Sequence, residues 1–134
     1  MKILLDTHVL IWALTNSPML SSKARSMILQ EDNEIYFSVV SLWEIELKHI
    51  TKPEKLPITA RSIFEFCSES GYKLVHLKEN SIFKLSELNR SESAPPHKDP
   101  FDRILLCQSI AEDMLFLTHD VKIADYNLKN IVTV

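Results

Sequence analysis

Five short segments of the sequence are apolar on both faces and rich in β-branched or aromatic residues. A strand with two apolar faces belongs in a parallel sheet that helices cover on both sides, because neither face can be left in water. The five segments expected to be strands are 2–5, 35–40, 72–76, 114–118 and 131–134.

Between these segments the apolar residues recur with helical spacing. Ser21 and Ser22 are suited to cap one such helix, and Gly71 is suited to end another. Strands that alternate with helices predict an α/β fold, here a three-layer α/β/α sandwich with a central parallel sheet, and residues 1–134 are expected to form a single domain. The segments expected to be helices are 8–15, 21–31, 41–50, 58–70, 79–89 and 100–112.

The composition excludes several classes of site. A single glycine rules out a P-loop, a GxGxxG turn and other glycine-rich phosphate sites. The formal net charge of −3 provides no general attraction for nucleic acid or for an anionic membrane. Cys67 and Cys107 lack a metal-binding spacing, so both are expected to be reduced core residues of a cytoplasmic protein. No apolar run approaches the ~18 residues of a membrane span, and Asp6 and His8 interrupt the first one, so no signal peptide is expected.

Acidic side chains come from four separate places in the sequence, each beside the predicted carboxyl end of a strand. Ligands of open α/β sheets bind beyond these ends. One acid ends the first strand, one lies in the first turn expected of the next helix, two open the helix before the fourth strand, and one follows that strand. The acids expected to meet at this edge are Asp6, Glu44, Asp99, Asp102 and Asp120.

Such a cluster is electrostatically unfavourable by itself. Two carboxylates 4 Å apart repel by about 4 kcal/mol at an effective dielectric constant near 20. Either a carboxyl group takes up a proton or a cation lies among them. Ligands that are all oxygen favour a hard divalent ion such as Mg²⁺ or Mn²⁺, which activates water and offsets the charge of a phosphoryl group. The sequence therefore favours hydrolysis of a phosphodiester.

Four motifs then suggest a family: LLDTHVLIW, SVVSLWEIELK, DPFDRILLCQS and LFLTHD, in this order along the whole chain. Together they resemble the PIN-domain family, and most closely the VapC-type toxins of bacterial type II toxin–antitoxin pairs. The resemblance implies a metal-dependent endoribonuclease that cleaves tRNA, rRNA or mRNA with metal-activated water. It also implies a homodimer and inhibition by an antitoxin protein encoded beside the toxin.

The resemblance assigns roles position by position. Thr118 matches a hydroxyl residue that often precedes the last acid and orients water or metal. Two positions depart from the family pattern: His8 stands where many members have asparagine, and Asp99 adds an acid beside the third acidic position. The catalytic residues implied are Asp6, Glu44, Asp102 and Asp120, with Asp6, Asp102 and Asp120 as the metal ligands.

Each acid also has a purely structural interpretation. Asp6 could cap the helix that follows it, and Asp120 could cap the short segment VKIAD. Glu44 could form a solvated i, i+4 pair with Lys48. Taken singly these interpretations are at least as good as the functional ones. The functional interpretation is favoured by the convergence of all the acids on one edge.

Other polar residues are weaker candidates. His8, His97 and His119 could move protons or contact RNA. Arg103 could contact a phosphate, although a salt bridge is the simpler expectation. Trp12 and Trp43 are interpreted as core or dimer anchors rather than as surfaces for base stacking. The lysines nearest the expected site are Lys48, Lys52, Lys55 and Lys98.

Two other functions remain open at this point. A phosphoacceptor domain could use Asp6, but one such family would need an aspartate where His8 stands and another would need paired acids that are absent. A catalytically inactive PIN-like protein-binding module would be expected to have lost at least one acid, and all four remain. Ribonuclease therefore ranks first, the binding module second and the phosphoacceptor third.

The two aspartates of the third motif are expected to have different roles. Pro100 suits the first position of a helix, which makes Asp99 the N-cap. Asp102 is then the third helical residue, near the partial positive charge of the helix start. We expect Asp99 to hold the helix and Asp102 to face Asp6 and the metal.

Overall fold

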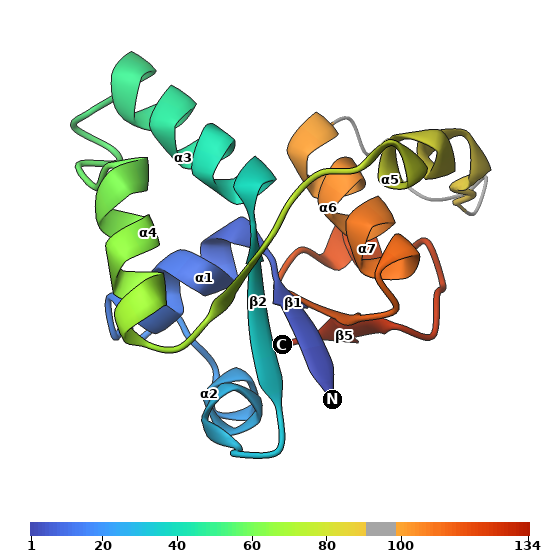
Figure 1. The fold of residues 1–134 in the computed structure, drawn as a ribbon, viewed down its shortest axis with the longest axis horizontal. Helices are drawn as coiled ribbons and strands as arrows, with labels where there is room; N and C mark the ends of the chain where they lie inside the picture. The colour runs from blue at the N-terminus through green and yellow to red at the C-terminus, as the bar shows by residue number, and fades with distance from the viewer. Residues whose placement is uncertain (91–98) are drawn as a thin grey trace.

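A computed structural model, which describes residues 1–90 and 99–134, shows a three-layer α/β/α sandwich around a five-stranded parallel sheet (Figure 1). The strand order is β3-β2-β1-β4-β5, so β1 is central and is paired with β2 on one side and β4 on the other. The predicted fold class is confirmed. The strands are β1 (Lys2–Leu5), β2 (Glu34–Ser38), β3 (Lys73–Val75), β4 (Leu115–Thr118) and β5 (Ile131–Thr133).

Helices connect successive strands and lie on both faces of the sheet (Figure 1). All six predicted helical segments contain helix, although the one predicted at 79–89 is divided into α5 and a short 3-10 helix. A further helix of four residues, α7, follows β4. The helices are α1 (Thr7–Leu14), α2 (Ser22–Leu29), α3 (Val39–Thr51), α4 (Ala60–Glu69), α5 (Glu79–Phe83), η1 (Lys84–Glu87), α6 (Pro100–Ala111) and α7 (Val121–Ala124).

The start of α3 corrects the predicted boundary between strand and helix. The segment 35–40 was expected to be entirely strand, but β2 ends at Ser38 and the helix begins at Val39. The Ser38 hydroxyl oxygen accepts a hydrogen bond from the Val40 N–H at 2.9 Å and so caps α3. Glu44 consequently lies in the second turn of the helix, not in the first.

Alternate residues of β1 face two separate cores. Ile3 and Leu5 pack with α1, α2 and α4, whereas Leu4 packs with α6 and α7. Cys67 is buried in the first core and Cys107 in the second, and both are free thiols, as expected. Burial raises the pKa of Cys67 to about 12 and that of Cys107 to about 11, so both thiols are neutral core groups.

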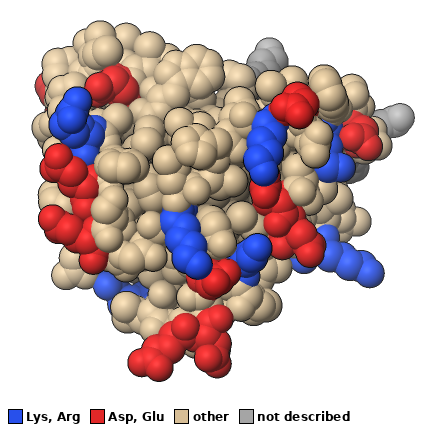
Figure 2. All heavy atoms as spheres, viewed as in Figure 1, with Lys and Arg blue, Asp and Glu red and all other residues tan. Residues whose placement is uncertain are grey.

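The surface carries charges of both signs. Figure 2 shows basic and acidic side chains interspersed over one face, with acidic side chains gathered at its lower end. No single-sign surface covers this face, in agreement with the small net charge of −3. Within residues 1–90 and 99–134, no helix is long and apolar enough to cross a membrane.

Gly71 ends α4 in a left-handed conformation, with φ of 80°. The Tyr72 N–H donates to the Cys67 carbonyl at 2.9 Å and the Gly71 N–H to the Ser68 carbonyl at 3.2 Å. These two bonds satisfy carbonyls at the helix end and turn the chain into β3. A Cβ atom at Gly71 would meet nothing within 4 Å, so only the backbone conformation requires glycine there.

Gly71→Ala should therefore lower the free energy of unfolding by about 1 kcal/mol, because the left-handed conformation is strained for alanine. Gly71→Asn should lower it less, since asparagine tolerates this conformation better. Urea unfolding followed by circular dichroism measures both values. Equal stability of Gly71→Ala and the wild type would contradict the assigned backbone role.

Candidate active site

The predicted acids meet at the carboxyl edge of the sheet. They line a cavity of about 450 Å³ that receives side chains from α1, from the start of α6 and from the segment after β4. Four of the five predicted acids reach this cavity, and Glu44 is buried nearby. The lining residues are Asp6, His8, Trp12, Met19, Asp99, Asp102, His119 and Asp120. We call this space the acidic cavity.

Both carboxylate oxygens of Asp6 are occupied by hydrogen bonds. Oδ1 accepts from the His8 N–H at 3.0 Å, which caps α1, and Oδ2 accepts from the Thr118 hydroxyl at 2.6 Å. Asp6 is 2% exposed. Burial raises the pKa of the Asp6 carboxyl, although the hydrogen bonds from Thr118 and His8 act in the opposite direction. The cap interpretation is thus correct, and it leaves Asp6 at the cavity wall.

Thr118 joins two of the acidic segments. Its hydroxyl donates to Asp6 and accepts from the Asp120 N–H at 3.1 Å. Asp120 Oδ1 in turn accepts from the Lys122 N–H at 2.9 Å and caps α7. The side chain of Thr118 is fully buried, so this small network fixes the relative position of the ends of β1 and β4.

Glu44 is a buried carboxylate with one partner. Its Oε2 pairs with Lys48 Nζ at 2.6 Å, as the i, i+4 spacing suggested. The Lys48 side chain is half exposed, but Glu44 is 1% exposed, so the carboxylate end of the pair is buried rather than solvated. Glu44 Oε1 is buried and has no hydrogen-bond partner among the described residues. An unsatisfied buried carboxylate oxygen is costly, typically by about 1–3 kcal/mol or more, and it marks a place where a donor or cation would be favourable.

Asp99 is the N-cap of α6, as expected. Its Oδ1 accepts from the N–H groups of Phe101 at 2.9 Å and Asp102 at 3.3 Å, and Pro100 occupies the first turn. Asp102 follows as the third helical residue and lies 9% exposed on the cavity wall. The separate placement of the two aspartates is therefore as predicted, while their separate functions remain predictions.

The pKa of Asp102, like that of Asp6, is raised in this site. Burial raises the pKa of its carboxyl to about 8, and the nearby charges of Asp6, Asp99 and Glu44 and a hydrogen bond with Asp120 raise it in the same direction. A carboxyl group with this pKa holds its proton at neutral pH. A proton on Asp102 would reduce the repulsion among the acids when no cation is bound.

The donor set fits a hard divalent ion in chemistry and charge. All the acidic side chains offer oxygen, the ligand atom that Mg²⁺ and Mn²⁺ prefer. Among the described residues, Glu44 Oε1 has no hydrogen-bond partner. In the described part of the chain, no three His, Cys, Asp or Glu side chains are already arranged to hold a metal ion. Metal binding would thus require Asp102 to release its proton and turn from Asp120.

Aromatic rings form another wall of the acidic cavity. The Trp12 ring lies between the His8 ring, at 5.9 Å between centroids, and the His119 ring, at 5.2 Å. Trp12 was expected to be a core or dimer anchor, and it does pack, partly buried, against the first core, but its place on the cavity wall was missed. The i, i+4 spacing of His8 and Trp12 could have revealed it, because it puts both on one face of α1.

The other polar and aromatic candidates do not line the acidic cavity among the described residues. Trp43 is 61% exposed on α3 and is therefore not a core residue. The Arg103 side chain hydrogen-bonds Tyr126, which belongs to the second core. Among the described residues no salt bridge forms at Arg103, so the expected salt bridge is not confirmed. His97 and Lys98 lie outside the described residues.

A family model of the PIN domain matches residues 3–128. The chain belongs to the PIN-domain family. This assignment confirms the resemblance inferred from the four motifs. No curated protein matches the sequence.

Solved structures share the fold of this PIN domain. A chain in the crystal structure of VapBC2 from Rickettsia felis bound to a promoter DNA fragment matches with a TM-score of 0.68 and 18% identity, over 100% of this chain and 98% of that chain. A chain of a toxin–antitoxin complex from Klebsiella pneumoniae matches with a TM-score of 0.57 and 17% identity, over 98% of this chain and 96% of that chain. A domain of a functionally unknown protein from Methanocaldococcus jannaschii matches with a TM-score of 0.58 and 16% identity, over 99% of this chain and 90% of that chain.

The raised pKa of Asp102 predicts how the stability of the metal-free PIN domain depends on pH. The folded protein holds a proton on Asp102 up to about pH 8, whereas the unfolded chain releases it near the ordinary aspartate pKa of 3.8. The native state binds more protons in this window, so stability should fall as pH rises from about 4 to about 8. Asp102→Asn should show a smaller fall.

Thermal melting in EDTA at several pH values measures this difference. Asp113→Asn is the matched control, because Asp113 is an exposed acid before β4 with φ of 55°, a conformation that asparagine tolerates. The control should follow the wild type. A wild type and an Asp102→Asn variant with parallel melting curves against pH would contradict the proton on Asp102.

Proposed function

We propose that this PIN domain is a metal-dependent endoribonuclease and the toxin of a toxin–antitoxin pair, with residues 1–134 acting as a single nuclease domain. The observation that carries the proposal is the acidic cavity, in which Asp6, Asp102 and Asp120 from separate segments face one space. Membership of the PIN-domain family supports it, and so does the fold shared with chains of VapBC2 and of a Klebsiella toxin–antitoxin complex.

We assign the metal, Mg²⁺ or Mn²⁺, to Asp6, Asp102 and Asp120. A divalent ion held there would supply a Lewis acid that favours ionisation of water and offsets negative charge on the scissile phosphate. Thr118 would hold one oxygen of Asp6 in place. Glu44, fixed by Lys48, would offer its remaining oxygen as an acceptor that orients the attacking water.

The proposed partners follow from the same assignment. RNA would be the substrate, a cognate antitoxin protein would bind and inhibit the toxin, and two copies of the chain would form a homodimer. The cytoplasm is the compartment we propose, because RNA and a co-expressed antitoxin meet there. A phosphoacceptor role is disfavoured, because His8 stands where one such family needs a second aspartate.

Three substitutions at the start of α6 test the enzyme. Asp102→Asn should keep the fold and abolish RNA cleavage in Mn²⁺, because it removes a metal ligand. Asp99→Asn should retain much of the cleavage, since asparagine caps a helix nearly as well as aspartate. Asp99→Ala should lower the free energy of unfolding by about 1 kcal/mol. Gel analysis of a labelled RNA and thermal melting measure both properties.

Three results would contradict the assignment. Cleavage that continues in excess EDTA would rule out the metal-dependent reaction. An inactive Asp99→Asn beside an active Asp102→Asn would mean that the two roles are reversed. Absence of cleavage by the wild type on any RNA would favour the inactive binding module.

Growth measurements test the toxin assignment separately. Induced expression of the wild type should arrest bacterial growth, whereas Asp102→Asn at an equal protein level should not. Co-expression of the protein encoded by the neighbouring reading frame should restore growth. Arrest that persists with Asp102→Asn would show that toxicity does not depend on the acidic cavity.

A further inference from the structure

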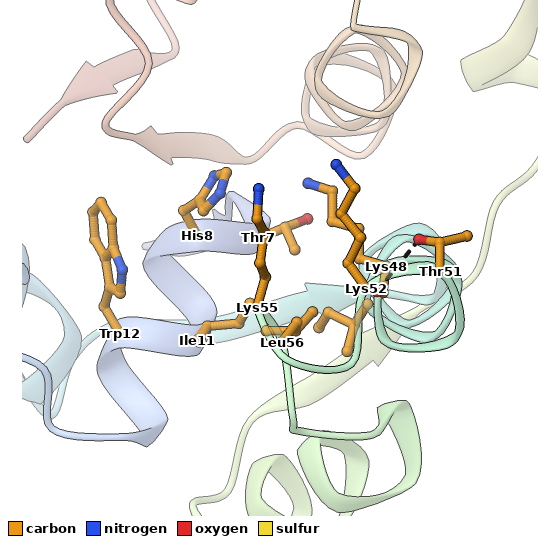
Figure 3. A pocket seen from close by; sticks show the side chains of 10 residues that line it. Thr7, His8, Ile11, Trp12, Lys48, Thr51, Lys52, Lys55 and Leu56 are labelled. Atoms are coloured by element: carbon orange, nitrogen blue, oxygen red, sulfur yellow. Dashed lines mark hydrogen bonds between the residues drawn. The ribbon is translucent and has the colours of Figure 1, made fainter.

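A second cavity, of about 610 Å³, lies beside the acidic cavity and carries three lysines. Lys48, Lys52 and Lys55 come from the last turns of α3 and the turn that follows it. Figure 3 shows their ammonium groups on one side, above Ile11 and Leu56. We call this space the lysine cavity.

The backbone fixes the lysines relative to one another. Lys48 and Lys52 are one helical turn apart, and the Lys55 N–H donates to the Lys52 carbonyl at 3.0 Å. The Leu56 N–H also donates to the Lys52 carbonyl at 3.2 Å, and the Leu56 carbonyl lies 2.8 Å from His49 Nδ1. The turn after α3 is therefore tied back onto the helix.

The positive charge of the lysine cavity is largely uncompensated. Lys48 is paired with Glu44, but neither Lys52 nor Lys55 forms an ion pair with any described residue. Lysines held close together repel one another, so an anionic ligand would be favourable there. This local excess contrasts with the net charge of −3 of the whole chain.

The lysine cavity and the acidic cavity share a wall. His8 and Trp12 line both of them. Lys48 also connects them electrostatically: burial lowers its pKa, but Glu44, and beyond it Asp99 and Asp102, raise it to a value above the ordinary one. A chain molecule with its reacting group at the acids would therefore continue past Trp12 to the lysines.

We propose that the lysine cavity binds the single-stranded RNA nucleotides next to the scissile phosphate, with Lys52 and Lys55 on phosphates and Trp12 against a base. The assignment of RNA rests on the proposed function. Single-stranded RNA presents a phosphate at every nucleotide and a flat base beside it, which matches cations above an apolar and aromatic surface. An acidic peptide could satisfy the lysines, but it has no need of a wall shared with the acids.

Binding without cleavage tests the proposal. The probe is a fluorescein-labelled single-stranded RNA of mixed sequence, titrated with the full chain in EDTA and followed by anisotropy. The double variant Lys52→Ala/Lys55→Ala should bind about tenfold more weakly at low salt, and its salt slope should be shallower by about 0.7 for each lost phosphate contact. The charge-matched control Lys23→Ala/Lys129→Ala changes two exposed lysines outside both cavities and should bind like the wild type.

Trp12 is tested by a pair of substitutions. Trp12→Ala should weaken RNA binding by about tenfold through the loss of stacking, and Trp12→Phe should restore most of the affinity because it keeps an aromatic face. Thermal melting of both variants identifies any loss that comes from unfolding. In cleavage assays the lysine double variant should raise KM and leave kcat close to the wild-type value.

Several results would overturn the proposal. These are wild-type affinity in the lysine double variant, an equal loss in the control, or no RNA binding by the wild type. A labelled polyglutamate peptide that binds through Lys52 and Lys55, while RNA does not, would assign the cavity to a protein partner. Lysine-dependent RNA binding without cleavage would instead refute the proposed nuclease and retain the RNA site.

Discussion

The site depends on the parallel pairing of β1 with both β2 and β4, because this pairing brings the ends of the three strands together. Three adjacent strands run in the same direction, so their carboxyl ends meet at one edge of the sheet. Asp6 leaves the first of these ends, α3 with Glu44 leaves the second, and Asp120 leaves the third. The hydrogen bond between Thr118 and Asp6 links the ends of β1 and β4, although the two residues are 112 positions apart in the sequence.

This edge of the sheet brings Asp6, Asp99, Asp102 and Asp120 to one cavity, with Glu44 buried nearby. Lys48 compensates the charge of Glu44, and the raised pKa of Asp102 favours a proton on that carboxyl group. The buried Glu44 oxygen without a partner shows that compensation is incomplete within the described residues.

The sequence predicted the sheet and the convergence of the acids because both depend on local signals: runs that are apolar on both faces, and acids directly after them. The start of α3 was missed because Val39 and Val40 continue a β-branched run, and only the Ser38 cap ends it. The burial of Glu44 was missed because an i, i+4 pair with lysine has the same spacing on a surface as in a site. The place of Trp12 depends on how α1 packs beside β4, which spacing alone does not give.

Helix capping makes the acids of this protein unusually easy to neutralise without unfolding it. Asp6, Asp99 and Asp120 each cap a helix, and asparagine performs that task about as well as aspartate. In the genetic code, a change of G to A in the first codon position converts either aspartate codon into an asparagine codon. A folded copy that has lost a charge at the sheet edge is therefore a single nucleotide change away, and populations of this gene should contain such copies wherever selection for the charge is relaxed.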